Sequence, residues 1–197
     1  MPDLVLASAS VSRRQMLENA GFRFEVLPIR IDEDAVRASL EAEGASPRDV
    51  ADALGEFKAR KGHEKRPDAV VLGSDQVLAF KGRVFGKAAD RDEAAAQLFE
   101  LQGQQHQLLS SAVIYHEGEP IWRSVGQVRM TMHRLSPAEI DAYLDHAWPA
   151  VSSSVGAYHA EGYGARLFSR IEGDWFSVLG LPLLDVCSFF RLRGWLD

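Results

Sequence analysis

Asp75 and Gln76 are the first residues here to suggest chemistry, because they interrupt the most apolar stretch in the first half of the chain, residues 69–80. The run Val70-Val71-Leu72 ahead of them predicts a buried strand. A carboxylate beside a buried strand is costly unless it has a partner or a task. Asp75 is therefore a candidate catalytic group, and a turn residue that caps its own backbone is the equal alternative.

A second polar group lies where a strand predicted at Leu4–Ala7 passes into a helix predicted at Val11–Gly21. Its members are Ser8, Ser10, Arg13 and Arg14. Hydroxyls, free backbone amides and the positive end of the helix dipole all favour an anion at such a junction. Two arginines in a first helical turn oppose that dipole, which favours a binding role over two solvated surface side chains.

The acidic cluster Asp32-Glu33-Asp34 has two interpretations: it could ligate a hard cation, or it could cap the next helix. Ser46-Pro47 predicts the start of another helix, because serine is a good N-cap and proline suits the first helical position. Lys58 lies on that helix near its apolar face, and spacing alone assigns it no role. The six histidines show no metal-ligand spacing, so we expect them to be structural or solvated.

The remaining pattern mixes strands and helices without strict alternation, which indicates an α/β or α+β class with a mixed sheet. Strands are predicted at Phe22–Pro28, Ala69–Phe80 with a return at Val84–Lys87, His106–Tyr115, Ile121–Met132 and Arg166–Ile171. Helices are predicted at Asp90–Leu101, at Ala138–His146 and after Gly180-Leu181-Pro182. Residues 152–165 are rich in glycine and serine and predict an irregular loop.

Composition narrows the class of protein further. The chain has 197 residues, a net charge of −6 and a single cysteine, Cys187, so no disulfide framework can form within it. The negative charge argues against nonspecific nucleic-acid binding. No apolar run approaches the roughly 18 residues of a membrane span, and residues 1–4 lack the pattern of a secretion signal. We expect a cytoplasmic protein that binds neither nucleic acid nor membranes.

Several short blocks, taken in order, resemble the Maf proteins, which are nucleoside triphosphate pyrophosphatases. The blocks are Leu6-Ala7-Ser8-Ala9-Ser10 with Arg13-Arg14, Asp32-Glu33, Lys58-Ala59, Gly73-Ser74-Asp75, Gly86-Lys87, Gly156-Ala157-Tyr158, Ile171-Glu172-Gly173 and Gly180-Leu181-Pro182. Each block alone is weak, but the ordered set spans essentially the whole chain. The resemblance implies a single Maf-like domain over residues 1–197, with the Maf/ITPase-like α/β fold: a mixed twisted sheet flanked by helices, in two lobes around a central cleft.

Two further positions resemble the YceF subgroup, whose preferred substrate is 7-methyl-GTP. They are Asp75-Gln76, where most Maf proteins have Asp-Thr, and Ala160-Glu161-Gly162, where most have Ile-Gln-Gly. The sequence departs from that subgroup at Ser12, where a tryptophan is frequent. The resemblance implies hydrolysis of 7-methyl-GTP between its α and β phosphates, which gives 7-methyl-GMP and diphosphate. The alternatives are a dTTP/UTP pyrophosphatase and a nucleotide-sensing regulator of septation.

The resemblance also assigns roles to the residues. Phosphate contacts fall to Ser8, Ser10, Arg13, Arg14, Lys58 and Lys87. Glu33 and Asp75 are expected to hold a divalent cation, Mg²⁺ or Mn²⁺, and Asp75 to orient or deprotonate the attacking water. Ser12, Gln76 and Glu161 are expected to select the base, and Trp175 could line the cleft. Family analogy also implies a homodimer.

Overall fold

The computed structural model describes residues 2–196 of the chain. Its centre is one mixed sheet with the strand order β2-β1-β3-β5-β6-β7, and β4 pairs with β3 beside this path. The strands are β1 (Leu4–Leu6), β2 (Glu25–Val26), β3 (Val70–Phe80), β4 (Arg83–Phe85), β5 (Gln105–His116), β6 (Glu119–Met132) and β7 (Phe168–Glu172). The pairs β1–β2 and β1–β3 are parallel and the remaining pairs are antiparallel. The predicted mixed sheet is therefore confirmed, and β5 and β6 form a long antiparallel hairpin.

Within the described residues, every α-helix except the last begins after a side chain that caps its first turn; the last one follows Pro182. The helices are α1 (Val11–Asn19), α2 (Glu33–Ala42), α3 (Pro47–Lys65), α4 (Arg91–Leu101), α5 (Pro137–Ala147), α6 (Trp175–Val178) and α7 (Leu183–Leu192), with 3₁₀ turns at Ala150–Ser153 and Tyr163–Leu167. Ser46 caps α3 and Ser136 caps α5, each in a reciprocal capping box. Asp32 caps α2 by accepting from the Ala35 amide at 3.0 Å, so the capping interpretation of the acidic cluster holds for that residue.

Two predictions of secondary structure need correction. The strand expected at Phe22–Pro28 shrinks to Glu25–Val26, an exposed edge pair with only β1 beside it. A strand at the edge of a sheet has one neighbour and makes few backbone hydrogen bonds. The alternating sequence pattern therefore predicts a longer strand than the pairing supports. The four-residue helix α6 was not expected, because one turn is too short to show a helical period; Asp174 caps it through the Phe176 and Ser177 amides.

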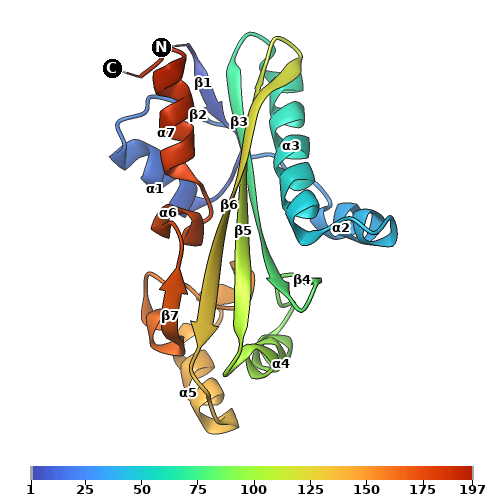
Figure 1. The fold of residues 1–197 in the computed structure, drawn as a ribbon, viewed down its shortest axis with the longest axis vertical. Helices are drawn as coiled ribbons and strands as arrows, with labels where there is room; N and C mark the ends of the chain where they lie inside the picture. Colours follow the sequence, from blue (N-terminus) through green and yellow to red (C-terminus); the bar gives the residue numbers. More distant parts are fainter. Residues whose placement is uncertain (1, 197) are drawn as a thin grey trace.

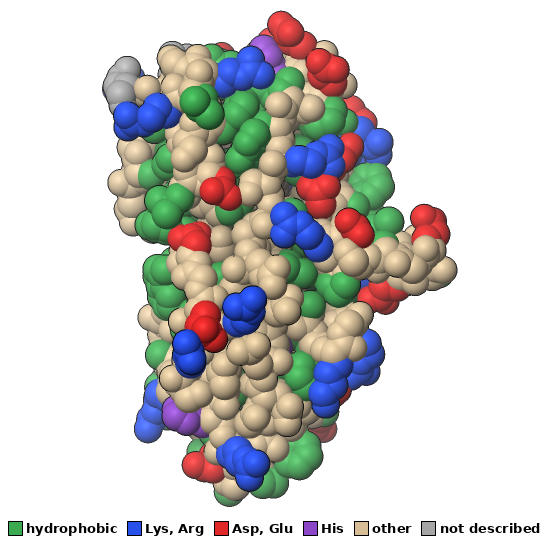
Figure 2. Space-filling model, in the orientation of Figure 1, with side chains coloured by type: hydrophobic (Ala, Val, Ile, Leu, Met, Phe, Trp, Pro, Cys, Tyr) green, Lys and Arg blue, Asp and Glu red, His purple; other side chains and the backbone are tan. Residues whose placement is uncertain are grey.

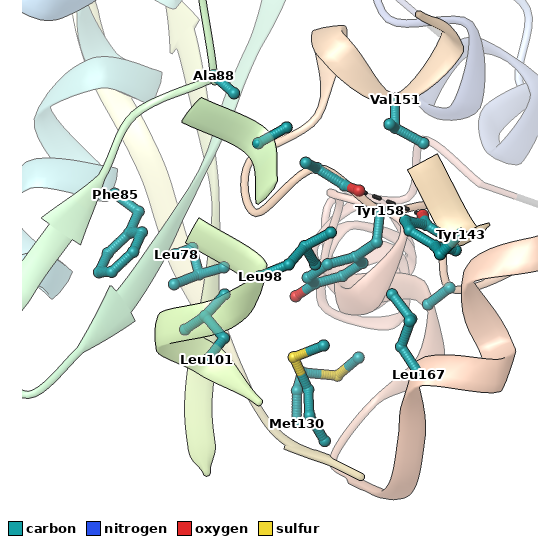
Figure 3. Packing of buried hydrophobic residues seen from close by; sticks show 14 of the residues in the cluster. Leu78, Phe85, Ala88, Leu98, Leu101, Met130, Tyr143, Val151, Tyr158 and Leu167 are labelled. Atoms are coloured by element: carbon teal, nitrogen blue, oxygen red, sulfur yellow. Dashed lines mark hydrogen bonds between the residues drawn. The ribbon is translucent and has the colours of Figure 1, made fainter. Parts of the chain in front are cut away.

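The long strands β3, β5 and β6 run from one end of the molecule to the other and join two lobes (Figure 1). At one end α1 and α7 cover one face of the sheet and α3 lies on the other, while α4, α5 and β7 surround the opposite end. The hydrophobic core at the end with α1 and α7 contains Leu17, Ile114 and Phe190, all essentially inaccessible to solvent. The core at the opposite end contains Leu98, Met130 and Tyr158 (Figure 3). The expected two-lobed architecture is therefore observed.

The outer surface carries charges of both signs. On the face in Figure 2, lysines and arginines alternate with aspartates and glutamates, without a continuous basic stripe over that face. Within residues 2–196, no helix combines the length and the apolar character that crossing a membrane requires.

Candidate active site

Asp75 lies in the middle of β3, where the alternation of the strand turns its side chain toward α3. Lys58 of α3 donates from Nζ to Asp75 Oδ1 at 2.5 Å, and both side chains are buried. Gly73, two residues earlier on the same face, allows the close approach of α3, because a Cβ there would stand 2.7 Å from the Ala59 Cβ. Ser111, opposite Asp75 on β5, accepts from its amide at 3.2 Å. Helix α3 therefore holds the Asp75 carboxylate, and β5 holds the Asp75 backbone.

Glu33, the first residue of α2, joins the same cluster. Its Oε1 accepts from Lys58 Nζ at 2.7 Å and its Oε2 from Lys87 Nζ at 3.0 Å. Burial alone would raise the pKa of Glu33, but the two ammonium groups outweigh it and lower that pKa to about 2. Lys58 therefore bridges the carboxylates of Glu33 and Asp75, and Lys87 adds a second cation at the cleft. Lys87 is itself held by a backbone bridge to Val155.

Arg13 occupies the junction between β1 and α1. Its Nε donates to the Gly180 carbonyl at 2.7 Å and its Nη1 to Ser8 Oγ at 3.3 Å, so the guanidinium is held from both ends of the chain. Burial lowers the pKa of Arg13, and the nearby Asp75 and Glu33 oppose that effect. Ser10 caps α1 through the Arg13 amide at 3.3 Å. An arginine has five N–H donors, so this one keeps donors for a ligand.

Gln76 points to the opposite face of β3 from Asp75, toward α6. Its Nε2 donates to Ser110 Oγ at 2.9 Å and to the carbonyls of Ser177 and Val178 at 3.0 and 3.1 Å. Because carbonyl oxygens only accept hydrogen bonds, the Nε2 atom of Gln76 must face the two carbonyls. Its Oε1 atom then points away from them. The carbonyl Oε1 is the polar atom left for the cleft. Gln76 therefore presents an acceptor there and also ties β3 to α6.

These side chains line one cavity of about 580 Å³ between the lobes. All but one of the predicted site residues line it: Ser8, Ser10, Ser12, Arg13, Glu33, Lys58, Asp75, Gln76, Lys87 and Glu161. The structure does not bring Arg14 into the cleft; this half-exposed side chain lies 3.7 Å from Glu18 along α1. Trp175, also suggested as a lining residue, is absent from the wall.

Sequence reasoning missed part of the wall. Tyr158 and His159 line the cleft just ahead of Glu161, and Ser154 lines it next to Val155. A buried hydrogen bond of 2.7 Å to His106 Nε2 holds the Tyr158 hydroxyl. Burial lowers the pKa of His106 to about 4, so this imidazole stays neutral. The nearness of His159 to Glu161 in the sequence was the available signal for its position.

The donor set can be tested for a divalent cation. Among residues 2–196, no group of three or more His, Cys, Asp or Glu side chains is arranged to hold a metal ion. Glu33 and Asp75 offer two carboxylates that meet at Lys58. Mg²⁺ is commonly held by one or two carboxylates together with waters and substrate phosphates. The pair therefore suits a cation that completes its shell with phosphate oxygens and water.

The family model for Maf-like proteins matches residues 3–192, nearly the whole chain. The chain belongs to the Maf-like family. A Maf-like relative from Jannaschia sp. (strain CCS1), "Nucleoside triphosphate pyrophosphatase 1", is 63% identical over 194 residues, which cover 98% of each chain. The "7-methyl-GTP pyrophosphatase" of Rhizobium meliloti (strain 1021) is 46% identical over 196 residues, covering 100% of this chain and 98% of that one.

Among solved structures, a nucleoside-triphosphatase / dITP/XTP pyrophosphatase from Mycobacterium abscessus is similar over 98% of this chain and 95% of its own. Its TM-score of 0.41 and 17% identity are too low to support an argument about this Maf-like protein.

Proposed function

We propose that this Maf-like protein hydrolyses 7-methyl-GTP to 7-methyl-GMP and diphosphate. The coarser activity, nucleoside triphosphate pyrophosphatase, is the one for which its full-length relatives are named. The observation that carries the proposal is the cluster in which Lys58 bridges Asp75 and Glu33, with Lys87 beside it, in the wall of a nucleotide-sized cleft.

The charges of the cleft suit a triphosphate. Three cations, Arg13, Lys58 and Lys87, accompany Glu33 and Asp75, which leaves this cluster one positive charge for the phosphate chain. Glu161 is a third carboxylate on the cleft wall and is assigned to the base. The Ser8 and Ser10 hydroxyls accept backbone N–H groups at the start of α1, and each keeps its own O–H as a donor where the helix dipole also favours an anion. Fixed donors aimed at phosphate oxygens stabilise the charge that develops during phosphoryl transfer.

Asp75 is the group that activates water. One carboxylate oxygen is held by Lys58, and the other can accept from a water directed at the α phosphorus. The water oxygen bonds to the α phosphorus while the bond from that phosphorus to the bridging oxygen breaks. The diphosphate leaves with the bonding electron pair, and the proton of the water passes to Asp75 and then to solvent.

Glu33 and Asp75 are the residues that would hold Mg²⁺ or Mn²⁺. Such a cation neutralises phosphate charge and lowers the pKa of bound water. Lys58 holds both carboxylates close together, which prepares them for that task.

The choice of 7-methyl-GTP among nucleoside triphosphates rests on the hydrogen-bonding edge of its base. A 7-methylguanine base carries a delocalised positive charge and presents N1–H and N2–H donors. Glu161 is an exposed carboxylate on the cleft wall, and it matches both properties. The Gln76 carbonyl adds a second acceptor. Ser12 leaves more room on the wall than a tryptophan would.

The first experiment tests catalysis. Asp75→Asn is expected to abolish release of diphosphate while nucleotide still binds. Asp68→Asn is the matched control, since Asp68 is exposed in the turn before the same strand and outside the cleft. Full turnover by Asp75→Asn would refute the role of Asp75, and a wild-type protein that binds nucleotide without turnover would indicate a sensor.

The second experiment tests the base. Turnover of 7-methyl-GTP, GTP, dTTP and UTP is compared with Mg²⁺ and with Mn²⁺. We expect the highest kcat/KM for 7-methyl-GTP, and Glu161→Gln should lower that preference more than it lowers turnover of UTP. A preference of the wild type for dTTP or UTP would overturn the assignment of Gln76 and Glu161.

A further inference from the structure

A smaller cavity of about 90 Å³ adjoins the cleft on the side of α2 and β4. The two cavities share five lining residues, Glu33, Asp75, Gln76, Lys87 and Val155. The smaller one adds Asp34, Arg37 and the glycine before Lys87, Gly86. This annex therefore continues the site beyond the catalytic carboxylates and brings a second cation, Arg37, into the same cavity wall as Lys87.

Arg37 is placed there by the helix that carries Glu33. The two residues are four apart on α2, so their side chains lie on the same face. The guanidinium rests against the backbone of Gly86, since a Cβ at that position would stand 2.5 Å from Arg37 Nη1. The absence of a side chain at residue 86 is thus what lets Arg37 lie against this backbone, in the same cavity wall as Lys87.

Arg37 retains donors for a ligand. Its Nη2 pairs at 3.0 Å with Asp34 Oδ1, but the Asp34 side chain is 82% exposed, so water screens that pair. The Arg37 side chain is only 25% exposed and lines the annex. A planar guanidinium matches two phosphate oxygens at once, which a lysine cannot do.

We propose that Arg37 and Lys87 form a subsite for the distal phosphates of the triphosphate, and that this subsite holds the diphosphate after cleavage. The inference rests on the proposed function and deepens it. The α phosphate lies between Arg13 and Asp75, so the rest of the phosphate chain extends past Glu33 into the annex. The leaving diphosphate then departs toward the guanidinium of Arg37 and the ammonium of Lys87.

The test measures binding of two product probes by calorimetry, inorganic diphosphate and 7-methyl-GMP. Arg37→Ala is expected to weaken diphosphate binding about tenfold or more, as expected for loss of a charged hydrogen bond. Binding of 7-methyl-GMP, which lacks the distal phosphates, should change less than about twofold. Arg37→Lys should recover part of the loss. Arg191→Ala, at an exposed arginine of α7 outside both cavities, is the matched control.

Gly86→Ala tests the geometry without removing a charge. Its new Cβ should push the guanidinium away and weaken diphosphate binding in the same direction as Arg37→Ala. In the Arg37→Ala background, Gly86→Ala should then add little, because the side chain it displaces is gone. Additive effects of the two changes would contradict the proposed contact.

The failures can be told apart. Equal loss of both probes in Arg37→Ala, or unchanged diphosphate binding, would overturn the subsite and leave the hydrolase activity standing. A wild-type protein that binds diphosphate through Arg37 but cleaves no triphosphate would overturn the proposed function and leave the subsite standing.

Discussion

Replacing Lys58 with methionine should destabilise the fold as well as the site, because it leaves two carboxylates facing each other without their shared cation. Removing one partner of a buried ion pair costs about 3–5 kcal/mol. The Lys58 and Asp75 side chains are 8% and 9% exposed, whereas that of Glu33 is 33% exposed and partly screened. We therefore expect the lower end, about 3 kcal/mol at neutral pH.

The loss of unfolding free energy in Lys58→Met should become smaller as the pH falls. The pKa of Glu33 falls from 4.5 to about 2 in the folded protein. The stabilisation that this shift represents is complete above pH 4.5 and is lost as the pH falls toward 2, because the unfolded chain takes up the proton first. Lys58→Met removes most of that stabilisation. The difference between wild type and variant should be constant above about pH 5.5 and should shrink below pH 4.5.

Urea unfolding at pH 7.5, 5.5 and 4.0 measures this. With a slope near 2 kcal/mol per molar urea, about 3 kcal/mol lowers the midpoint by about 1.5 M. Lys61→Met, at an exposed lysine of the same helix, should stay within about 0.5 kcal/mol of wild type. Adding Glu33→Gln to Lys58→Met should restore part of the loss. A variant as stable as wild type at pH 7.5, or a deficit undiminished at pH 4.0, would refute the reasoning.

Three further changes probe the supports of the cleft. The pKa of His106 is about 4 in the folded protein and about 6.5 in the unfolded chain. The free energy of unfolding of the wild type should therefore fall by up to about 3 kcal/mol between pH 6.5 and 4. His106→Gln should reduce this pH dependence, measured as unfolding midpoints over a pH series. Gly73→Ala should separate α3 from β3, lower the thermal unfolding midpoint and reduce kcat; unchanged kcat would count against the close approach. Ser110→Ala removes a partner of Gln76, costs about 1–3 kcal/mol, and should narrow the preference for 7-methyl-GTP over UTP in a turnover assay.

The sequence was most informative where short motifs carry the chemistry. Asp75, Lys58 and Lys87 come from three separate segments, and the ordered motifs assigned them to one site that the structure assembles. The pattern did not reveal that Asp75 and Gln76 face opposite sides of β3, because the apolar run around them is buried on both faces and hides its alternation. Arg14 shows a related limit, since neighbours on a helix point in different directions.

Other features had no local signal. The contact of Arg37 with Gly86 joins α2 to the segment after β4. The Gly86-Lys87 block marked one side of it, but Arg37 does not stand out in the sequence. The three acceptors of Gln76 come from β5 and α6, far away in the sequence. Such contacts depend on the packing of the two lobes, which periodicity and capping residues do not specify.

The hydrogen bond from Arg13 to the Gly180 carbonyl has a consequence for biosynthesis. Its partners are 167 positions apart, and Ser74 donates to the same carbonyl at 3.1 Å. The ribosome makes Arg13 long before it makes the Gly180 carbonyl. Until residue 180 has left the ribosome, the nascent chain therefore lacks both hydrogen bonds to this carbonyl, and the Arg13 guanidinium is not yet held in its folded position.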